Sequence, residues 1–269
     1  MIRLKYFLSF FIGTLVYTGI FAQVDTPPSP YGGSSLMKEF ICNEMIYPPE
    51  AMKDKIQGTV EVTITVMQDG KALNHHVTGS VYPDLDAEAL RISKLLLFYP
   101  AVKNGSYIIE NITIPVKFNV KKYKRNCKNK GLDDFEQYSG PADSSLKVYP
   151  TGSVDRAPRP VFKDPAMNFG KYISQNLKYP DIAYKQSITG DVELSFVVET
   201  SGRISNIEVV NPLGGGCTEE AISLINQLLW SPGMYKGMAV RTSLSARISF
   251  NLENNSNHQY LPNNTNTTM

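Results

Sequence analysis

The sequence has few of the side chains from which metal, cofactor and catalytic sites are built. Its 269 residues include three cysteines, three histidines and one tryptophan. Cys42, Cys127 and Cys217 form no Cys-x-x-Cys pair, so neither a zinc site nor a thiol-redox site is expected. His75 and His76 are neighbours on a predicted strand and point to opposite faces, which disfavours shared metal binding. We therefore expect no cofactor, no metal ion and no enzymatic activity.

The chain also lacks an excess of either charge. It has 27 basic and 25 acidic side chains, a formal net charge of +2. A nucleic acid backbone demands a strongly basic face, so nucleic acid is not an expected partner. No phosphate-binding loop or nucleophile motif indicates a small-molecule substrate. The length is sufficient for two domains of ordinary size.

Only the N-terminus carries a long apolar run. Arg3 and Lys5 precede the apolar residues 6–22, and Ala22 precedes the polar Gln23. This order is typical of a secretory signal peptide, so we expect residues 1–22 to be cleaved and the protein to be periplasmic. The alternative is an uncleaved inner-membrane anchor, although a run of about 17 residues is at the short limit for spanning a bilayer.

An internal repeat organises the rest of the chain. An offset of 132 residues aligns Tyr47-Pro48 with Tyr179-Pro180, and residues 40–120 with 172–252 without a gap. The two segments are identical at 21 of these 81 positions, and the matches include turn-forming Gly and Pro residues. A fixed offset of this kind indicates two copies of one fold.

Each copy shows the same order of predicted elements. Apolar residues alternate along 60–66 and 192–198, which indicates a sheet with one buried face. The turns Asp69-Gly70 and Ser201-Gly202 then predict hairpins. Helical spacing of apolar residues follows, ended by Pro100 and Pro232, before a last alternating strand. The predicted fold class is α+β, with two tandem modules, each a three-stranded antiparallel sheet covered on one face by helices.

The segments outside the repeat have a different composition. Module 1 is predicted at residues 31–120, module 2 at 158–252, and a linker at 121–157. The linker begins with a basic cluster: Lys121, Lys122, Lys124, Arg125, Lys128 and Lys130. We expect an ordinary solvated linker here, with contact to an anionic envelope polymer or lipid as the alternative. The tail, 253–269, is rich in Asn and Thr and is expected to be disordered.

The second copy resembles the C-terminal domain of TonB, in the form common in Bacteroidetes. The resemblance is carried by Tyr179-Pro180, Gly190-Asp191-Val192, Glu220-Ala221, Trp230-Ser231-Pro232-Gly233 and Phe250, and it covers nearly all of residues 158–252. The first copy keeps Tyr47-Pro48 and Pro100 but has Phe98 in place of the tryptophan, so it resembles a diverged copy.

The resemblance implies recognition of a partner. TonB C-terminal domains take up an extended peptide of TonB-dependent outer-membrane receptors as a strand beside the last strand of the sheet, close to the Tyr-Pro segment. The residues implied for this peptide site are Lys178, Tyr179, Pro180, Arg241, Thr242, Ser243, Leu244, Ser245, Arg247 and Ser249. Four side chains of the last strand are expected to point outward, and they are polar and leave room for a peptide. They are Thr242 (or Ser243), Ser245, Arg247 and Ser249. The alternative is that they form only a solvent-facing surface.

Three functions follow from these patterns. The first is a periplasmic module that binds extended peptides of outer-membrane receptors or other envelope proteins. The second is an anchored energy transducer, which the short proline segment at 27–30 disfavours because it cannot bridge a periplasm. The third is an envelope scaffold without peptide capture. Self-association is left open by the sequence.

Overall fold

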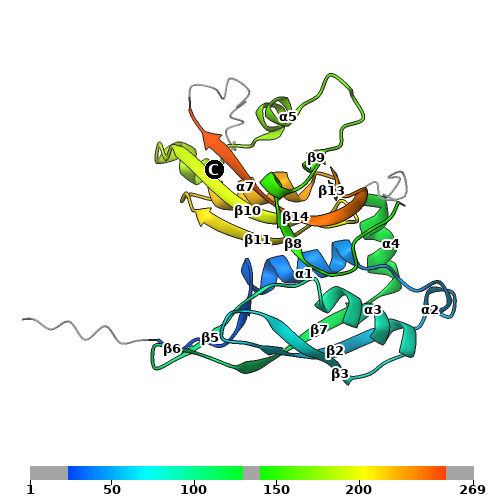
Figure 1. The fold of residues 1–269 in the computed structure, drawn as a ribbon. Helices are drawn as coiled ribbons and strands as arrows, with labels where there is room; N and C mark the ends of the chain where they lie inside the picture. Colours follow the sequence, from blue (N-terminus) through cyan, green and yellow to red (C-terminus); the bar gives the residue numbers. More distant parts are fainter. Residues whose placement is uncertain (1–23, 130–139, 253–269) are drawn as a thin grey trace, which may run out of the picture.

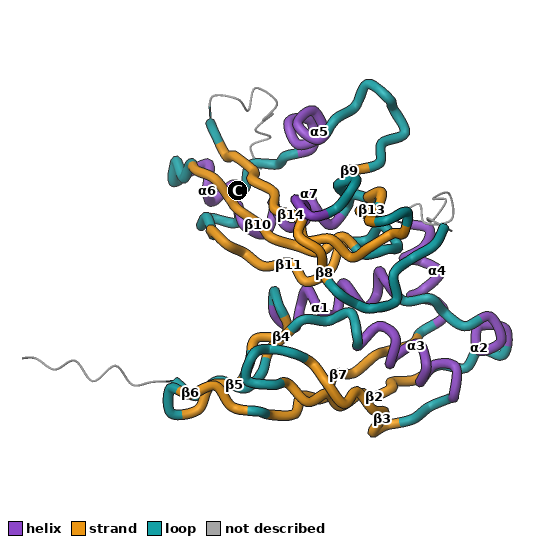
Figure 2. Tube along the Cα trace, viewed as in Figure 1, coloured by secondary structure: helices purple, strands orange, loops and turns teal. Residues whose placement is uncertain are grey.

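The computed structural model describes residues 24–129 and 140–252, which form two stacked modules (Figure 1). The predicted signal peptide and the predicted disordered tail lie outside the described residues, as does part of the predicted linker. Figures 1 and 2 show the sheet of module 1 below, helix α1 in the middle, and the sheet of module 2 above.

Module 1 contains a three-stranded antiparallel sheet in the order β3-β2-β7. Val60, Val62, Ile64 and Val66 are fully buried, as their alternation along β2 predicts. Helix α3 packs against this buried face of the sheet. The elements are β1 (Ser29–Pro30), α1 (Gly33–Glu44), α2 (Pro49–Lys53), β2 (Gly58–Val66), β3 (Ala72–Gly79), α3 (Pro83–Ser93), β4 (Phe98–Tyr99), β5 (Ala101–Lys103), β6 (Ser106–Ile108), β7 (Glu110–Phe118) and α4 (Val120–Asn129).

Module 2 repeats this arrangement and adds strands to it. Its sheet has the order β11-β10-β14-β13, and β8 pairs with β14 in parallel. The elements are β8 (Val148–Pro150), the 3-10 turn η1 (Thr151–Ser153), β9 (Arg159–Pro160), α5 (Phe169–Asn176), α6 (Asp181–Lys185), β10 (Gly190–Val198), β11 (Ile204–Asn211), α7 (Cys217–Asn226), β12 (Trp230–Ser231), β13 (Gly233–Tyr235) and β14 (Met238–Phe250). The α+β prediction is confirmed, and module 2 carries two more strands than the three predicted.

The repeat extends to details that the sequence pattern does not specify. Asn74 and Asn206 are equivalent residues, and both have a left-handed backbone, with φ of 53° and 51°. The register shifts between β2 and β3 recur between β10 and β11 at the same offset. The hydroxyls of Tyr47 and Tyr179 donate to the equivalent carbonyls of Ile56 and Ile188, each at 2.5 Å. The two modules therefore share their bulge and their core contacts as well as their topology.

The structure differs in part from the solvated linker predicted at 121–157. Residues 120–129 form α4, and residues 148–150 form β8 in the sheet of module 2. Val120 and Tyr123 of α4 pack against the core of module 1, and the Tyr123 ring lies 5.4 Å from that of Tyr47. The sequence pattern did not reveal these elements because α4 buries only a narrow apolar stripe and β8 has three residues.

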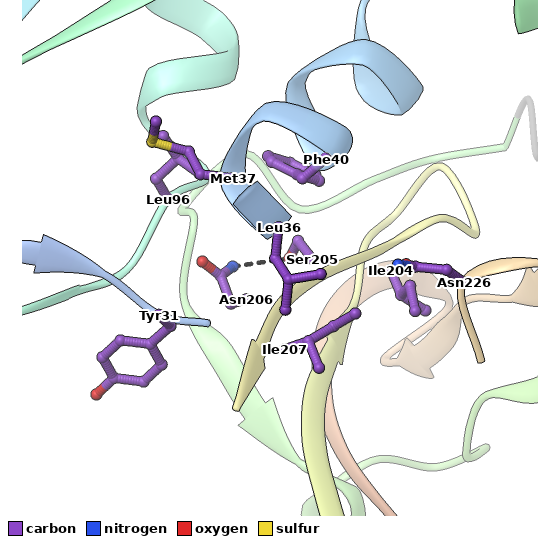
Figure 3. Close-up of a pocket in the computed structure, with 10 residues that line it drawn as sticks. All are labelled: Tyr31, Leu36, Met37, Phe40, Leu96, Ile204, Ser205, Asn206, Ile207 and Asn226. Atoms are coloured by element: carbon purple, nitrogen blue, oxygen red, sulfur yellow. Dashed lines mark hydrogen bonds between the residues drawn. The ribbon is translucent and has the colours of Figure 1, made fainter. Parts of the chain in front are cut away.

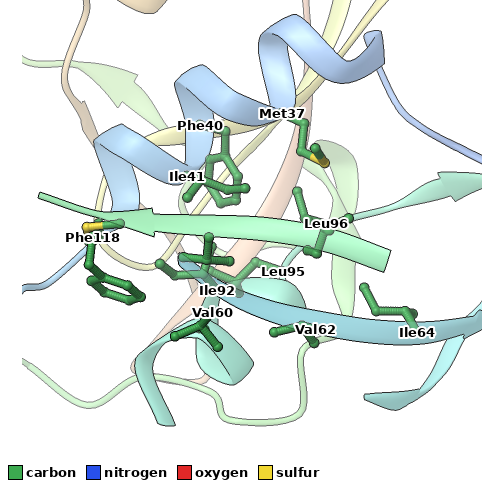
Figure 4. Packing of buried hydrophobic residues seen from close by; sticks show 14 of the residues in the cluster. Met37, Phe40, Ile41, Val60, Val62, Ile64, Ile92, Leu95, Leu96 and Phe118 are labelled. Carbon is green, nitrogen blue, oxygen red and sulfur yellow. The ribbon is translucent and has the colours of Figure 1, made fainter. Parts of the chain in front are cut away.

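Helix α1 joins the two modules. Figure 4 shows Phe40 and Ile41 of α1 packed into the core of module 1. On its other side Leu36 packs against the core of module 2, beside β11 (Figure 3). Gly32 precedes the helix with φ of 71°, and a Cβ there would lie 2.3 Å from the Ile207 carbonyl oxygen. Only glycine permits this close approach between the modules.

Polar contacts complete the joint between the modules. The Asn206 side chain on β11 accepts a hydrogen bond from the Leu97 N–H at 2.8 Å and donates one to the Leu95 carbonyl at 2.9 Å. The Tyr99 hydroxyl donates to Glu208 at 2.5 Å. Because Asn206 is 8% exposed, these bonds satisfy backbone groups that have little access to water.

Candidate functional site

The outer side of β14 is paired along only part of its length. Its inner side pairs with β10 from Thr242 to Phe250. On the outer side, β8 pairs with residues 241–243 and Ala239 bonds to Pro141 and Asp143, whereas β13 pairs with residues 238–240 on the same side as β10. No strand in the described part of the chain pairs with the outer side of residues 244–250. We call this segment the open edge; at roughly 3.3 Å per residue it is about 20 Å long.

The backbone direction of the open edge follows from one hydrogen bond. The Thr151 hydroxyl donates to the carbonyl of Ser243, so this carbonyl points away from β10. Backbone polar groups of an antiparallel strand alternate between its two sides. The N–H and C=O groups of Ser245, Arg247 and Ser249 therefore point outward. The open edge thus offers three donors and three acceptors in the geometry that an added strand needs.

The side chains of these three residues lie on the exposed face of the sheet. Arg247 forms an ion pair with Glu193 on β10, with Nη2 and Oε1 separated by 2.6 Å. The Ser249 hydroxyl donates to Asp191 at 2.6 Å. These cross-strand contacts hold both side chains over β10, and so they do not cover the outer side of β14.

Arg241 and Thr242 are among the predicted site residues, but both lie outside the open edge. Arg241 is 3% exposed and Thr242 is fully buried. Ser243 is half-buried beside β8, and the Ser243 hydroxyl donates to the Tyr149 carbonyl at 3.5 Å. Of the two alternatives for the start of the outward row, Thr242 or Ser243, the structure therefore excludes Thr242. The cause is β8, a linker strand that covers this end of β14.

Arg241 instead forms contacts with module 1, the linker and Glu199 of module 2. Its guanidinium lies 2.7 Å from the Glu199 carboxylate and donates to the carbonyls of Leu146 in the linker and Leu95 in module 1, at 2.8 and 2.6 Å. Burial raises the pKa of Glu199, against the opposing effect of the Arg241 charge. Sequence reasoning missed Glu199; the one signal available was a carboxylate at the end of an otherwise apolar strand.

The Tyr-Pro segment supports the end of the open edge from within. Tyr179 is 2% exposed, and its ring meets that of Phe250 edge-on at 5.7 Å. The Lys178 N–H donates to Glu220 at 2.8 Å. Pro180 is half-buried and Leu244 packs against the core, so neither offers a free side chain to a partner. Of the ten predicted residues, the structure exposes four: Lys178, Ser245, Arg247 and Ser249.

Module 1 presents a different edge at the equivalent place. Pro115 of β7 occupies the position of Arg247, since it pairs with Glu61 as Arg247 pairs with Glu193. A proline has no N–H, and in a strand its nitrogen faces away from the paired neighbour. The outer side of β7 therefore lacks its central donor. The next outward residue is Lys117, and proline and lysine are the residues that most often block edge pairing.

Within residues 24–129 and 140–252, no helix is long and apolar enough to cross a bilayer. The same residues contain no group of three or more His, Cys, Asp or Glu side chains placed to hold a metal ion. The unpaired edge of β14 has the geometry to which an extended chain can add.

The family model of the Gram-negative bacterial TonB protein C-terminal domain matches this chain twice. The matches cover residues 43–120 and 175–252, together more than half of the chain. The chain belongs to this family. Its two modules are tandem TonB C-terminal domains, as the sequence repeat predicts. No curated protein matches the chain.

Family membership places the protein in a broad functional class. TonB C-terminal domains are associated with transport and the cell envelope or periplasm, and they are not enzymes. They interact with outer-membrane receptors and other envelope proteins. A TonB-like role in energy transduction or receptor interaction is therefore supported for this chain.

Proposed function

We propose that module 2 captures extended peptide segments of outer-membrane receptors or other envelope proteins by adding them as a strand to the open edge. The observation that carries the proposal is the outward row of backbone groups at Ser245, Arg247 and Ser249, which no described strand pairs. Strand addition obtains its affinity from main-chain hydrogen bonds, so little side-chain identity is needed.

The proposal assigns capture to module 2 alone. Pro115 removes the central donor from the equivalent edge of module 1, and Lys117 places a charge beside it. Four residues of α1 and α4 lie beside Pro115 and Lys117: Lys38, Ile41, Cys42 and Lys122. Module 1 then has a structural role: it helps to hold β8 and the hydrogen-bonded Arg241 side chain in place.

The position of β8 sets the length of chain that module 2 can take. β8 occupies the outer side of β14 up to Ser243, where the Thr151 hydroxyl also binds. An incoming strand is therefore confined to residues 244–250. A segment of about six residues fills this space at the strand rise of roughly 3.3 Å per residue.

An anchored energy transducer and an unanchored binding protein would capture a peptide at the same edge of module 2. The discriminating measurement is the N-terminal sequence of the mature protein. A chain that starts at Gln23 has lost the apolar segment and binds without a membrane anchor of its own. A chain that keeps residues 1–22 favours the anchored energy transducer.

The test of capture is a matched pair of substitutions at Arg247. Arg247→Pro removes the outward N–H at the centre of the open edge and copies the residue that module 1 tolerates at this place. Arg247→Ala removes the same side chain and keeps the N–H. Both are titrated by calorimetry against synthetic peptides from the periplasmic N-terminal segments of TonB-dependent receptors.

We expect Arg247→Pro to weaken binding about tenfold, because one backbone hydrogen bond contributes about 1 kcal/mol and the ring crowds the added strand. Arg247→Ala should change the affinity less than threefold. Equal affinities of the proline variant and the parent protein would contradict strand addition at this edge. Absence of binding by the parent protein to every peptide would favour the scaffold without peptide capture.

A further inference from the structure

Helix α4 carries a basic face that is independent of the open edge. The helix has the sequence Val-Lys-Lys-Tyr-Lys-Arg-Asn-Cys-Lys-Asn. At 100° per residue, its cations fall on one side, opposite the stripe of Val120, Tyr123 and Cys127. Val120 and Tyr123 pack against the core of module 1, so the cations are held on a docked helix. The exposed cations are Lys121, Lys122, Lys124, Arg125 and Lys128.

No acidic side chain balances this face locally. The sequence contains no Asp or Glu between Glu110 and Asp133. Among the described residues, no carboxylate forms an ion pair with any cation of α4. The chain as a whole is nearly neutral, with 27 basic and 25 acidic side chains. The positive charge is therefore concentrated on α4 rather than spread over the surface.

A small apolar pocket extends the basic face beside α4. It has a volume of about 210 Å³, and Ile41, Cys42 and Pro115 are among the residues that line it. Three lysines from three different elements border it: Lys38 of α1, Lys117 of β7 and Lys122 of α4. A pocket with apolar lining and lysines at its border suits an amphipathic ligand, which carries an anionic group next to an apolar group.

The acidic side chain next to Lys38 on α1 does not offset the positive charge around the pocket. Glu39 follows Lys38 but lines a separate hollow with Glu219 and Ile222 of α7, on the side of module 2. The basic face, defined as the five cations of α4 with Lys38 and Lys117, thus contains seven positive charges.

We propose that the basic face docks the protein on an anionic phospholipid surface. Headgroup phosphates would face the ammonium groups, and the apolar pocket would accept part of one acyl chain. Clusters of four to eight Lys and Arg residues on a helix are typical of such binding. Because Val120 and Tyr123 of α4 pack against the core of module 1, the helix adsorbs by charge and does not insert into the bilayer.

The residue types favour a lipid surface over a specific acidic peptide. Six of the seven cations are lysines, which act as flexible, hydrated point charges. Specific carboxylate or phosphate recognition favours the rigid fork of arginine, and the basic face has one arginine. Figures 1 and 2 place α4 at the opposite end of the molecule from the Phe250 end of β14, so docking leaves the open edge uncovered.

The test measures adsorption to vesicles. The chain starting at Gln23 contains every described residue and lacks the apolar segment that would enter a bilayer by itself. It is sedimented with vesicles of phosphatidylcholine containing 30% phosphatidylglycerol (about a third anionic lipid, within the range where basic clusters bind) and with pure phosphatidylcholine vesicles. We expect binding to the first, none to the second, and a steep loss as salt is raised from about 50 to 300 mM.

Two charge-matched variants sharpen the test. The first replaces Lys121, Lys124, Arg125 and Lys128 by Glu. The second replaces four exposed lysines elsewhere by Glu: Lys53, Lys163, Lys171 and Lys185. We expect the first variant to lose at least 100-fold in partitioning, since each of its four cations contributes about fivefold near a lipid surface. The second should lose much less. Unchanged receptor-peptide binding by both variants shows that each is folded.

Three results would overturn the proposal. One is equal binding to neutral and anionic vesicles. Another is an equal loss in the two variants, which would show that only net charge matters. The third is binding to soluble poly-glutamate at a salt concentration where vesicles do not bind, which would assign the basic face to an acidic polymer.

Discussion

The last strands of the two modules differ where the rest of the modules agree. Their buried residues form equivalent contacts, including Tyr47 on Phe118 and Tyr179 on Phe250, both edge-on at 5.7 Å. Their outer edges have diverged: β7 presents Pro115, whereas β14 presents Arg247. Core packing constrains both copies alike, but only an edge that receives a strand must keep its donors. The difference therefore supports the proposal that module 2 is the binding copy.

The modules also differ in a buried ion pair. Glu199 and Arg241 of module 2 correspond to Met67 and Ile109 of module 1, and Ile109 is exposed. The pair is specific to module 2, where β8 and module 1 both reach Arg241. It serves the joint between the modules rather than the TonB fold itself, since module 1 folds without it.

The largest expected effect comes from breaking this pair. Arg241→Ala leaves the Glu199 carboxylate buried without its partner, which should destabilise module 2 by about 3–5 kcal/mol. Trp230 is the single tryptophan and lies in the core of module 2. Its fluorescence during chemical denaturation therefore reports the unfolding of this module.

The matched control removes both charges together. Glu199→Met with Arg241→Ile installs the two residues that module 1 has, and replacing a whole buried pair by apolar side chains is close to neutral. We expect a loss of less than about 2 kcal/mol. If the single and double variants were destabilised equally, the loss would not come from the unpaired Glu199 charge, which would contradict this account of the ion pair.

A smaller effect separates the two equivalent bulge residues. Asn206→Ala unpairs the Leu97 N–H, leaves the Leu95 carbonyl with Arg241 as its one donor and places alanine at a positive φ, so it should cost about 2–4 kcal/mol. Asn74 is exposed, and Asn74→Ala should cost only about 1 kcal/mol of backbone strain. Calorimetric unfolding measures both.

Glycine at each position isolates the contacts between modules. It accepts positive φ without strain, so Asn74→Gly should be nearly neutral while Asn206→Gly keeps the loss of hydrogen bonds. Equal stability of these two glycine variants would show that the Asn206 contacts do not hold the modules together.

The smallest expected effect concerns the aromatic residue that differs between the copies. Trp230 packs against Phe196 at 5.5 Å, and its indole nitrogen is buried without a hydrogen-bond partner among the described residues. Trp230→Phe copies Phe98 of module 1, removes this unpaired N–H and should cost about 1 kcal/mol. Phe98→Trp overfills module 1 and should cost about 1–3 kcal/mol by calorimetry. A larger loss for Trp230→Phe than for Phe98→Trp would contradict the equivalence of the two sites.

Much of the fold could be predicted from the sequence because it rests on local patterns. Alternation along β2 and β10, and the Tyr-Pro stops before α2 and α6, specify the modules directly. The repeat adds the register, since two copies with the same Gly and Pro positions constrain each other.

The exposure of the candidate site could be predicted only in part. Ser245, Arg247 and Ser249 follow from alternation, but the burial of Arg241 and Thr242 depends on β8, which has too few residues to show a period. The joint through Asn206 and Leu95 joins residues more than a hundred positions apart. Contacts of that range leave no local signal in one sequence.

The most direct test of the central claim is amide hydrogen exchange on isotope-labelled protein, resolved by residue. In the free protein, the N–H groups of Ser245, Arg247 and Ser249 should exchange quickly, while those of Ala246 and Ile248 should be protected by β10. A bound receptor peptide should protect the first three and leave the other two unchanged. Protection of all five without peptide, or exposure of the first three with peptide bound, would contradict strand addition at the open edge.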